Sequence, residues 1–387
     1  MAKRSGINNI DLDILFVLPS LNLIVYGGTK IIFELCRKFK NNGESVGVLY
    51  IRDLYSTLGM IDPDKKISSY LKKLGLKGLL YKLATLFGNN ILVYKHVMPF
   101  LRKVLNVRMS EQPLDVEIFF GKRALNSRKI LKVIATSWDT GPYSLLVNAK
   151  EHFHFIQGLE FREEFTGELH TLAETSFSLP TKKIVVNEEL RRKFNLDKDL
   201  KVRVGINQNI FRCFSLPDKR RNKKVAFQLM SHPVKGGTLA LDSIRIILRK
   251  RPDIEIVSYG NINRRLVPNG VKHFGYVSEE SLSQIFNDVE IFVLPSLLEG
   301  TPLPGLEAMS CGAAVISTNN VGILEYIVSG VNGIISNNMK PEGIAEDVIK
   351  LIDNSKLRIT LALNGMETSK LFSYNNMYHD FKNALSQ

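Results

Sequence analysis

The residues best suited to chemistry are two carboxylates, Glu299 and Glu307, in the segment VEIFVLPSLLEGTPLPGLEAMSCGAAVIST (289–318). The pattern predicts a strand that ends at Pro295, a loop with Glu299, and a helix that begins near Pro304, since proline suits a first helical position. A helix start offers N–H groups and a positive dipole end to an anion. A carboxylate beside such donors can bind neutral hydroxyls and face developing positive charge. Taken alone, an acidic residue that complements the dipole of a helix N-terminus is an equal alternative.

Strands that alternate with helices position these residues. Strands are predicted at 14–18, 46–51, 116–120, 133–136, 153–157 and 184–187, and again at 224–230, 254–259, 291–294 and 313–317. Helices are predicted at 27–43, 236–252, 279–286, 304–310 and 343–353. This alternation predicts an α/β protein with parallel sheets covered by helices on both faces. Two such halves, joined near 195–222, indicate two Rossmann-like domains that bind ligands in the cleft between them.

The composition is that of a globular protein with excess positive charge. The 387 residues include 52 Lys and Arg against 38 Asp and Glu, a formal net charge of +14, with 44% hydrophobic residues. This mix argues against a disordered, collagen-like or coiled-coil chain. Three scattered cysteines exclude a disulfide framework, give no metal-site spacing and favour a reducing compartment. No run approaches the roughly 20 apolar residues that cross a bilayer, and the first residues do not read as a secretory signal.

Segment 289–318 resembles the signature of glycosyltransferase family 4, whose members are retaining enzymes of the GT-B fold. The family pattern is a strand, P-S, and then E-G-x-x-L-P-x-L-E-A-M-x-x-G. The residues that match it are Pro295, Ser296, Glu299, Gly300, Leu303, Pro304, Leu306, Glu307, Ala308, Met309 and Gly312. The A-T-S-W and F-I-Q-x-x-E patterns at 135–138 and 155–160 resemble a subgroup that includes rhamnosyltransferases of bacterial surface polysaccharides.

The resemblance implies an N-terminal acceptor-binding domain (1–200) and a C-terminal nucleotide-sugar-binding domain (201–370). Residues 371–387 would form a helix that crosses back onto the first domain. It also implies that Glu299 lies by the transferred sugar and that Glu307 binds the ribose. The loop between them would hold sugar hydroxyls and phosphate, and its residues are Gly300, Thr301, Pro302 and Leu303. Pro302 removes one N–H where many members have glycine.

The segment HPVKGGTLALDSI (232–244) is similar to the K-G step of the family. The resemblance implies that Lys235 is the cation on the donor diphosphate, a task that suits a mobile point charge, with Gly236 beside it. Taken alone, Lys235 would be a solvated loop lysine. No arginine stands a few residues before it, although many members have one there. The same resemblance places the nucleobase near Tyr276 and Val277, although a lone tyrosine is more often packing.

In the first half, Gly27 and Gly28 open the first predicted helix, where glycine allows close approach of a ligand to the backbone. Their position after the first strand, as in family 4, favours donor binding over a plain turn. Many members have a sugar-contacting histidine in the region of 133–160. Gln157 is the nearer counterpart here, with His154 upstream, and both are candidate contacts to sugar or acceptor. For His154 a structural role is the stronger alternative.

The resemblance implies a retaining transfer of a sugar from a nucleotide-diphosphate sugar to an acceptor hydroxyl. Lys235, helix-start N–H groups and the Gly27–Gly28 loop would stabilise the leaving diphosphate, so we expect no cofactor and no metal. Closure of the two domains would exclude water, which otherwise hydrolyses the donor. The donor base stays open between UDP, GDP and dTDP, with a hint of dTDP-rhamnose from the subgroup.

The first half also contains a basic stretch, residues 65–108, with ten Lys or Arg and no acidic residue. Its lysines alternate with leucines, which suggests a basic amphipathic helix on an anionic membrane surface. A solvated basic face packed on the sheet is an equal alternative. We expect a peripheral protein on the cytoplasmic face of a membrane, with a glycan or lipid-linked acceptor, as in many family 4 members.

Two other classes of function are compatible with parts of this sequence. A GT-B protein that hydrolyses or isomerises the donor without transfer, such as a nucleotide-sugar epimerase, is disfavoured by the complete family loop. A nucleic-acid-binding module is suggested by the charge alone, but the basic stretch is rich in leucine and lacks interleaved RNA-binding aromatic motifs. We therefore expect no nucleic-acid partner.

Overall fold

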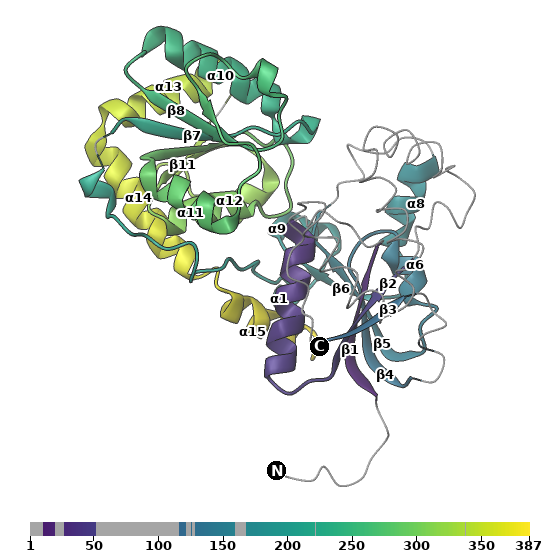
Figure 1. Cartoon of the computed structure of the whole chain (residues 1–387). Coiled ribbons are helices and arrows are strands. Elements are labelled where there is room, and N and C mark those ends of the chain that lie inside the picture. Colours follow the sequence, from purple (N-terminus) through teal and green to yellow (C-terminus); the bar gives the residue numbers. More distant parts are fainter. Residues whose placement is uncertain are drawn as a thin grey trace, which may run out of the picture. The chain divides into compact units, whose positions relative to one another are not determined.

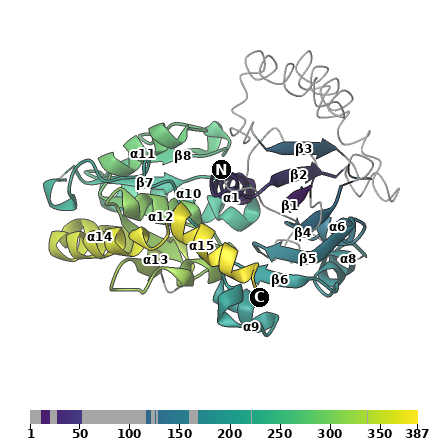
Figure 2. The ribbon, with the colours of Figure 1, turned by 90° about the horizontal axis from the view of Figure 1, so that it is seen from below.

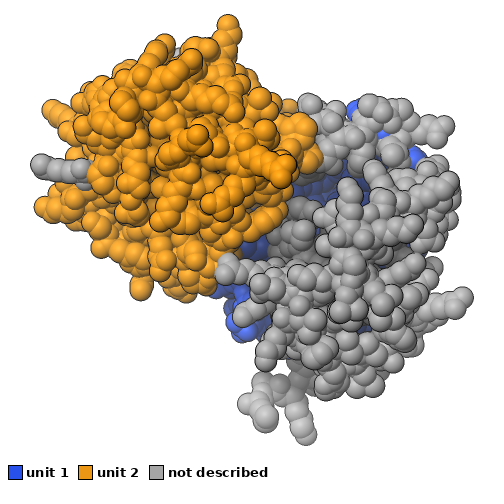
Figure 3. All heavy atoms as spheres, turned by 45° about the horizontal axis from the view of Figure 1, so that its top comes forward, with its two compact units in different colours: residues 1–157, 164–185 blue, residues 158–163, 186–387 orange. Residues whose placement is uncertain are grey.

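The computed structural model describes residues 11–19, 27–51, 116–120, 125, 128–158, 168–220, 222–336 and 338–387. The chain divides into two compact units, residues 1–157 with 164–185 and residues 158–163 with 186–387 (Figure 3). The chain passes from β6 into the second unit after Val185, ahead of the boundary predicted after residue 200.

The first unit contains a parallel sheet in the order β3-β2-β1-β4-β5-β6 (Figure 2). Phe16 of the central strand pairs with Val48 on one side and Ile134 on the other. This order reverses direction at β1 and β4, as in doubly wound folds that bind ligands at that point. The strands are β1 (Leu12–Leu18), β2 (Val46–Tyr50), β3 (Glu117–Phe120), β4 (Ile130–Ala135), β5 (Ala149–Ile156) and β6 (Lys182–Val185).

Helices cover both faces of this sheet, α1 on one face and α6 and α8 on the other (Figure 1). The bounds are α1 (Gly27–Asn41), α6 (Thr140–Ser144) and α8 (Glu168–Ser176). Helix α1 buries Ile31, Ile32, Leu35 and Phe39, because residues three or four apart share one helix face. The chain turns after it at Gly43, whose φ of 90° suits glycine.

The second unit repeats the design with a parallel sheet in the order β12-β11-β10-β7-β8-β9. The direction reverses between β7 and β10, where Phe227 pairs with Val293. The strands are β7 (Lys224–Gln228), β8 (Glu255–Tyr259), β9 (Lys272–His273), β10 (Ile291–Leu294), β11 (Ala314–Thr318) and β12 (Ile334–Ser336). In each unit a ligand site is therefore expected at the carboxyl ends of the two central strands, where the strand order reverses.

The helices of the second unit are α9 (Glu188–Lys193), α10 (Gly237–Lys250), α11 (Glu279–Asp288), α12 (Leu303–Ser310), α13 (Pro341–Asp353), α14 (Ser355–Lys370) and α15 (Tyr374–Ala384) (Figure 2). Helices α10 and α13 share an apolar core with one sheet face through Ile244 and Val348. On the opposite face Phe286 of α11 packs against Phe292 and Tyr259. The second unit also contains the short 3₁₀ helices η2 (Lys198–Leu200), η4 (Pro233–Lys235) and η6 (Val321–Glu325).

The structure confirms the predicted α/β class with two parallel sheets and the strands and helices around the Glu299 segment. It adds elements that the sequence pattern did not show, namely the strands β9 and β12 and the helices α6, α8, α9 and α14. Helix α14 was not predicted, because its hydrophobic periodicity is weak. Its buried face includes Arg358, Gly365 and Ser369 along with apolar residues. Helix α15 forms as predicted and belongs to the second unit; its return to the first domain stays a prediction.

Two further predictions concern membranes. The basic stretch at 65–108 lies outside the described residues, so its contact with a membrane also stays a prediction. Among the helices that the structure describes, none is both long enough and apolar enough to span a bilayer.

Candidate active site

The loops that follow β7 and β10 converge at the carboxyl edge of the second sheet. The Lys235 loop (residues 229–237) follows β7, and the Glu299 loop (residues 297–303) follows β10. The amide of Leu297 donates to the carbonyl oxygen of Val234 at 2.7 Å and ties the two loops together. The strand order, with β7 next to β10, therefore brings together two motifs that lie more than sixty positions apart in the chain.

Gly236 allows this close approach. Its φ is 65°, in the left-handed region, and it ends η4 and precedes α10. A Cβ at this position would lie 2.0 Å from the carbonyl oxygen of Pro295, which no side chain can tolerate. The glycine of the predicted K-G step is thus required both by its backbone conformation and by the loop packed against it.

Lys235 and Glu299 form the centre of the site. The Lys235 ammonium lies 2.7 Å from both Oε1 and Oε2 of Glu299, and the two side chains are 33% and 13% exposed. The lysine is therefore partly open to a ligand, whereas the carboxylate is largely enclosed. The structure thus places the predicted phosphate-binding cation and the predicted sugar-facing carboxylate in direct contact.

Helix α12 begins directly after the Glu299 loop, as predicted, with Pro302 at its N-cap and Pro304 in its first turn. Glu307, one turn further on, is 5% exposed. The hydroxyl of Tyr326 donates to the carbonyl oxygen of Pro302 at 2.7 Å. Burial, followed by the carboxylates of Glu299 and Glu307, raises the pKa of Tyr326 well above its usual value, so the hydroxyl keeps the proton that it donates.

The Glu299 loop and the residue before it, Ser296, rest on the end of β11 and on the residues that follow this strand. Thr318 and Asn320 both donate to the carbonyl oxygen of Ser296, the second at 3.1 Å. Gly322 lies under the loop, because a Cβ there would be 2.6 Å from the Gly300 carbonyl oxygen and 2.8 Å from that of Glu299. These supporting residues were missed by the sequence analysis, and Asn320 carried a signal only as the N-cap of η6.

Tyr276 and Val277 lie in a loop beside the end of β8. The amide of Gly260 donates to the carbonyl oxygen of Gly275 at 2.8 Å, and the Leu229 amide donates to that of Tyr259 at 2.8 Å. The loops after β7, β8 and β9 are therefore connected by backbone hydrogen bonds along one edge of the sheet. Tyr276 is 65% exposed, which leaves its ring free to stack on a planar ligand.

In the first unit, Gly28 and Gln157 come together. Gly27 and Gly28 open α1, and Gln157 follows β5. A Cβ on Gly28 would lie 2.9 Å from Oε1 of Gln157. Two residues that the sequence analysis assigned separately, one to the donor and one to the sugar or acceptor, therefore share a site at the end of the sheet.

His154 is enclosed in the same unit. Its side chain is fully buried, its Nε2 lies 3.1 Å from the Ser137 carbonyl oxygen, and its ring stacks on Phe177 at 5.2 Å. Gly141 is packed against it, with a potential Cβ only 3.2 Å from the ring. In this conformation the imidazole presents no surface to a substrate, which supports the structural alternative.

The burial of His154 predicts a pH-dependent stability. Burial lowers the pKa of His154 from 6.5 to about 4; the hydrogen bond with Ser137 opposes this effect, and the charge of Lys183 adds to it. Between these two values the unfolded chain binds more protons than the native one, so stability is lost as the pH falls from about 6.5 towards 4, by on the order of 3 kcal/mol.

Denaturant unfolding at neutral pH and at about pH 4.5 measures this loss. His154→Phe should remove it, whereas the same change at the exposed His379 should not. An equal pH dependence in wild type and His154→Phe would contradict the assignment.

Comparison with known proteins places this site in a family. A model of the family "Glycosyl transferases group 1" matches residues 217–368, which include Lys235, Glu299 and Glu307. An α-1,3-N-acetylgalactosaminyltransferase of Campylobacter jejuni, named for the substrate N,N'-diacetylbacillosaminyl-diphospho-undecaprenol, is 25% identical over 84% of this chain and 89% of its own. CapM, a capsular polysaccharide biosynthesis glycosyltransferase of Staphylococcus aureus, is 25% identical over 51% of this chain and 59% of its own.

The fold is similar to that of solved glycosyltransferase structures. A crystal structure of Anabaena HepE in complex with UDP and glucose superposes with a TM-score of 0.66 over 97% of this chain and 99% of that chain, at 14% identity. Fold, motif and relatives together define a glycosyltransferase of the GT-B fold. The match to the group 1 glycosyltransferases lies within the second unit of the chain.

Proposed function

We propose that this glycosyltransferase moves a sugar from a nucleotide-diphosphate sugar to a hydroxyl of a glycan or lipid-linked acceptor with retention of anomeric configuration. The observation that carries the proposal is the direct contact of Lys235 with Glu299 at the edge of the second sheet. A diphosphate would bind the partly exposed ammonium. The carboxylate would then face the positive charge that develops on the sugar ring.

In the proposed reaction the bond from the anomeric carbon to the diphosphate oxygen breaks, and a bond from that carbon to the acceptor oxygen forms on the same face. The acceptor proton passes to the leaving diphosphate, so that the products are a glycoside and a nucleoside diphosphate. Lys235 and the amides at the start of α12 would stabilise the charge on the leaving group. Glu307 would bind the ribose, and Tyr276 the base.

The acceptor class rests on the names of relatives. One acts on an undecaprenol-linked sugar and another serves capsular polysaccharide synthesis. These names support an acceptor that is a growing glycan, lipid-linked or free. We also propose that the protein works at the cytoplasmic face of a membrane. UDP, GDP and dTDP donors are all compatible with the site, because Tyr276 can stack on any base.

We also propose that no metal is needed, because Lys235 supplies a positive charge where the diphosphate would lie. The chain has Asp-x-Asp triplets, a spacing that bridges a metal to the diphosphate in other glycosyltransferases. One of them, Asp11 to Asp13, is at the amino end of β1, where Asp11 accepts from the Lys129 amide and Asp13 from Ser45. A second, Asp197 to Asp199, lies at the start of η2, with Asp197 at the N-cap and Asp199 inside this short helix. The third, Asp62 to Asp64, lies outside the described residues.

The test is release of nucleoside diphosphate from a panel of UDP-, GDP- and dTDP-sugars, with and without EDTA, in the presence of lipid-linked and glycan acceptors. We expect turnover of one donor that EDTA does not reduce and that depends on acceptor. Lys235→Ala should weaken nucleoside-diphosphate binding by at least about 10-fold, because a charge-assisted contact contributes about 1.5–3 kcal/mol.

Lys250→Ala, which removes an exposed lysine at the far end of α10, is the control and should bind nucleotide as wild type does. Turnover without acceptor, with an epimer or free sugar as product, would instead support a non-transferring enzyme. Loss of all turnover in EDTA, restored by a divalent cation, would refute metal independence.

A further inference from the structure

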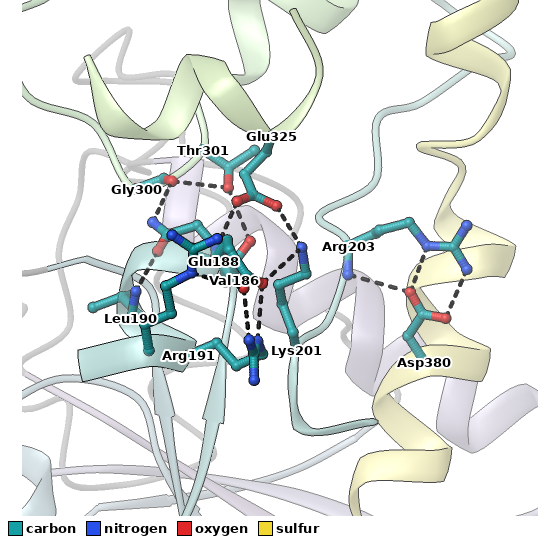
Figure 4. Close-up of polar contacts among 12 residues, drawn as sticks. Val186, Glu188, Leu190, Arg191, Lys201, Arg203, Gly300, Thr301, Glu325 and Asp380 are labelled. Atoms are coloured by element: carbon teal, nitrogen blue, oxygen red, sulfur yellow. Dashed lines mark hydrogen bonds and ion pairs between the residues drawn. The ribbon is translucent and has the colours of Figure 1, made fainter. Parts of the chain in front are cut away.

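The Glu299 loop is held by a segment that is remote in sequence. This post-β6 segment (residues 186–203) begins where the chain leaves β6 and includes α9 and η2. Figure 4 shows Gly300 and Thr301 above Val186, Glu188 and Leu190, with Glu325 and Lys201 beside them. All these residues belong to the second unit.

Asn187 makes the most specific contact of this segment. Its side chain is 2% exposed. Oδ1 accepts from the Leu190 amide at 2.9 Å and so caps α9, while Nδ2 donates to the Gly300 carbonyl oxygen at 2.8 Å. Asp, Ser or Thr could also cap α9. Unlike these residues, asparagine also has a side-chain amide N–H, and this group donates to the loop.

Neighbouring charges fix the same segment to η6. The Glu188 amide donates to Oε1 of Glu325 at 2.6 Å, and the Lys201 ammonium lies 3.0 Å from Oε2 of Glu325 and 3.7 Å from Glu188. The Arg191 guanidinium, hydrogen-bonded to Glu188, lowers the pKa of Glu188 to about 2. Glu188 is therefore ionised at neutral pH, and the contacts of Glu188, Lys201 and Glu325 hold Asn187 next to the loop.

Holding one carbonyl oxygen orients a donor on the opposite side. The Gly300 C=O and the Thr301 N–H belong to the same planar trans peptide, so they point in opposite directions. Nδ2 of Asn187 bonds the oxygen, and Gly322 packs under it at a potential Cβ distance of 2.6 Å. The Thr301 N–H, one of the predicted sugar or phosphate donors, is thereby turned away from Asn187.

We infer that Asn187 is a positioning residue for sugar transfer, which sets the Gly300–Thr301 peptide and thereby the place of Glu299. This inference rests on the proposed function. Asn187 acts through the loop and does not touch the reacting atoms. Its contribution should therefore appear in the rate of transfer more than in the affinity for nucleotide, which Lys235 supplies.

The test is Asn187→Ser, which keeps a helix cap and removes the amide N–H from Gly300. We expect kcat to fall by about 100-fold, the order of loss when a catalytic group is misplaced by about 1 Å. The Kd for the nucleoside diphosphate that wild type binds should change less than about threefold. Glu325→Gln, which leaves an acceptor for the Glu188 amide but removes the ion pair with Lys201, should lower kcat in the same direction by about 10-fold.

Asn354→Ser is the matched control, because Asn354 caps α14 through the Leu357 amide and should leave kcat unchanged. If Asn187→Ser and Asn354→Ser both transfer as wild type does, the inference is overturned. If Asn187→Ser loses nucleotide affinity and thermal stability in parallel with kcat, Asn187 is only structural. If wild type itself binds no nucleoside diphosphate, the proposed function fails instead.

Discussion

Replacing Glu299 with glutamine is expected to lower kcat for sugar transfer by about 10²–10³-fold, the scale measured when one preorganised electrostatic group is lost. The amide keeps the shape of the side chain but loses the negative charge that would face the sugar. It also frees the Lys235 ammonium, now 2.7 Å from both carboxylate oxygens. Because that ammonium is then open to the diphosphate, the affinity for nucleoside diphosphate should stay the same or increase.

Steady-state kinetics with a fixed donor, together with calorimetric titration of nucleoside diphosphate, separate these two effects. Glu280→Gln is the matched control, since Glu280 is an exposed acid in the first turn of α11 and its loss should not alter transfer. A variant that loses nucleotide affinity and rate by the same factor would show that Glu299 serves mainly to shape the loop.

Gly236→Ala should unfold or loosen the site more than any substitution of a polar residue there. The methyl group would lie 2.0 Å from the Pro295 carbonyl oxygen, in a residue whose φ is 65°. Left-handed backbone alone costs on the order of 1–2 kcal/mol for alanine, and the clash forces the two loops apart. We expect a large fall in Tm and a loss of nucleotide binding, because Lys235 and Glu299 no longer meet.

Gly270→Ala separates backbone strain from the clash. Gly270 has a φ of 86°, but nothing lies within 4 Å of its potential Cβ. This variant should lose only about 1–2 kcal/mol of stability and should bind nucleotide normally. Equal thermal stability and nucleotide affinity in the two variants would show that the loops after β7 and β10 are not packed through Gly236. Thermal melting and nucleotide titration give both quantities.

The fold could be predicted because its signals are local. Apolar runs such as Ile291–Leu294 and the helical spacing of Ile31, Ile32, Leu35 and Phe39 are read within a few residues of sequence. Alternation of the two patterns then requires parallel sheets. Short edge strands such as β9, with only Lys272 and His273, give no such signal, since a two-residue strand has no period to detect.

The motif residues of the site, Lys235, Gly236, Glu299 and Glu307, were also predicted from sequence, because the two short segments that contain them resemble the pattern of glycosyltransferase family 4. Their contacts were not. The pairing of Lys235 with Glu299 depends on β7 lying beside β10, and the meeting of Gly28 with Gln157 depends on the order of strands in the first sheet. His154 was proposed from its neighbourhood in sequence, and the structure buries it.

The sequence by itself determined the class of fold and indicated the candidate site residues, because periodicity and two short motifs carry these signals. Only the tertiary structure decided what holds these motifs in place. Asn187 reaches Gly300 across 113 positions, and Glu325 reaches Lys201 across 124. Nothing in either segment alone encodes the other's location, because such contacts arise only when the sheets and helices have packed.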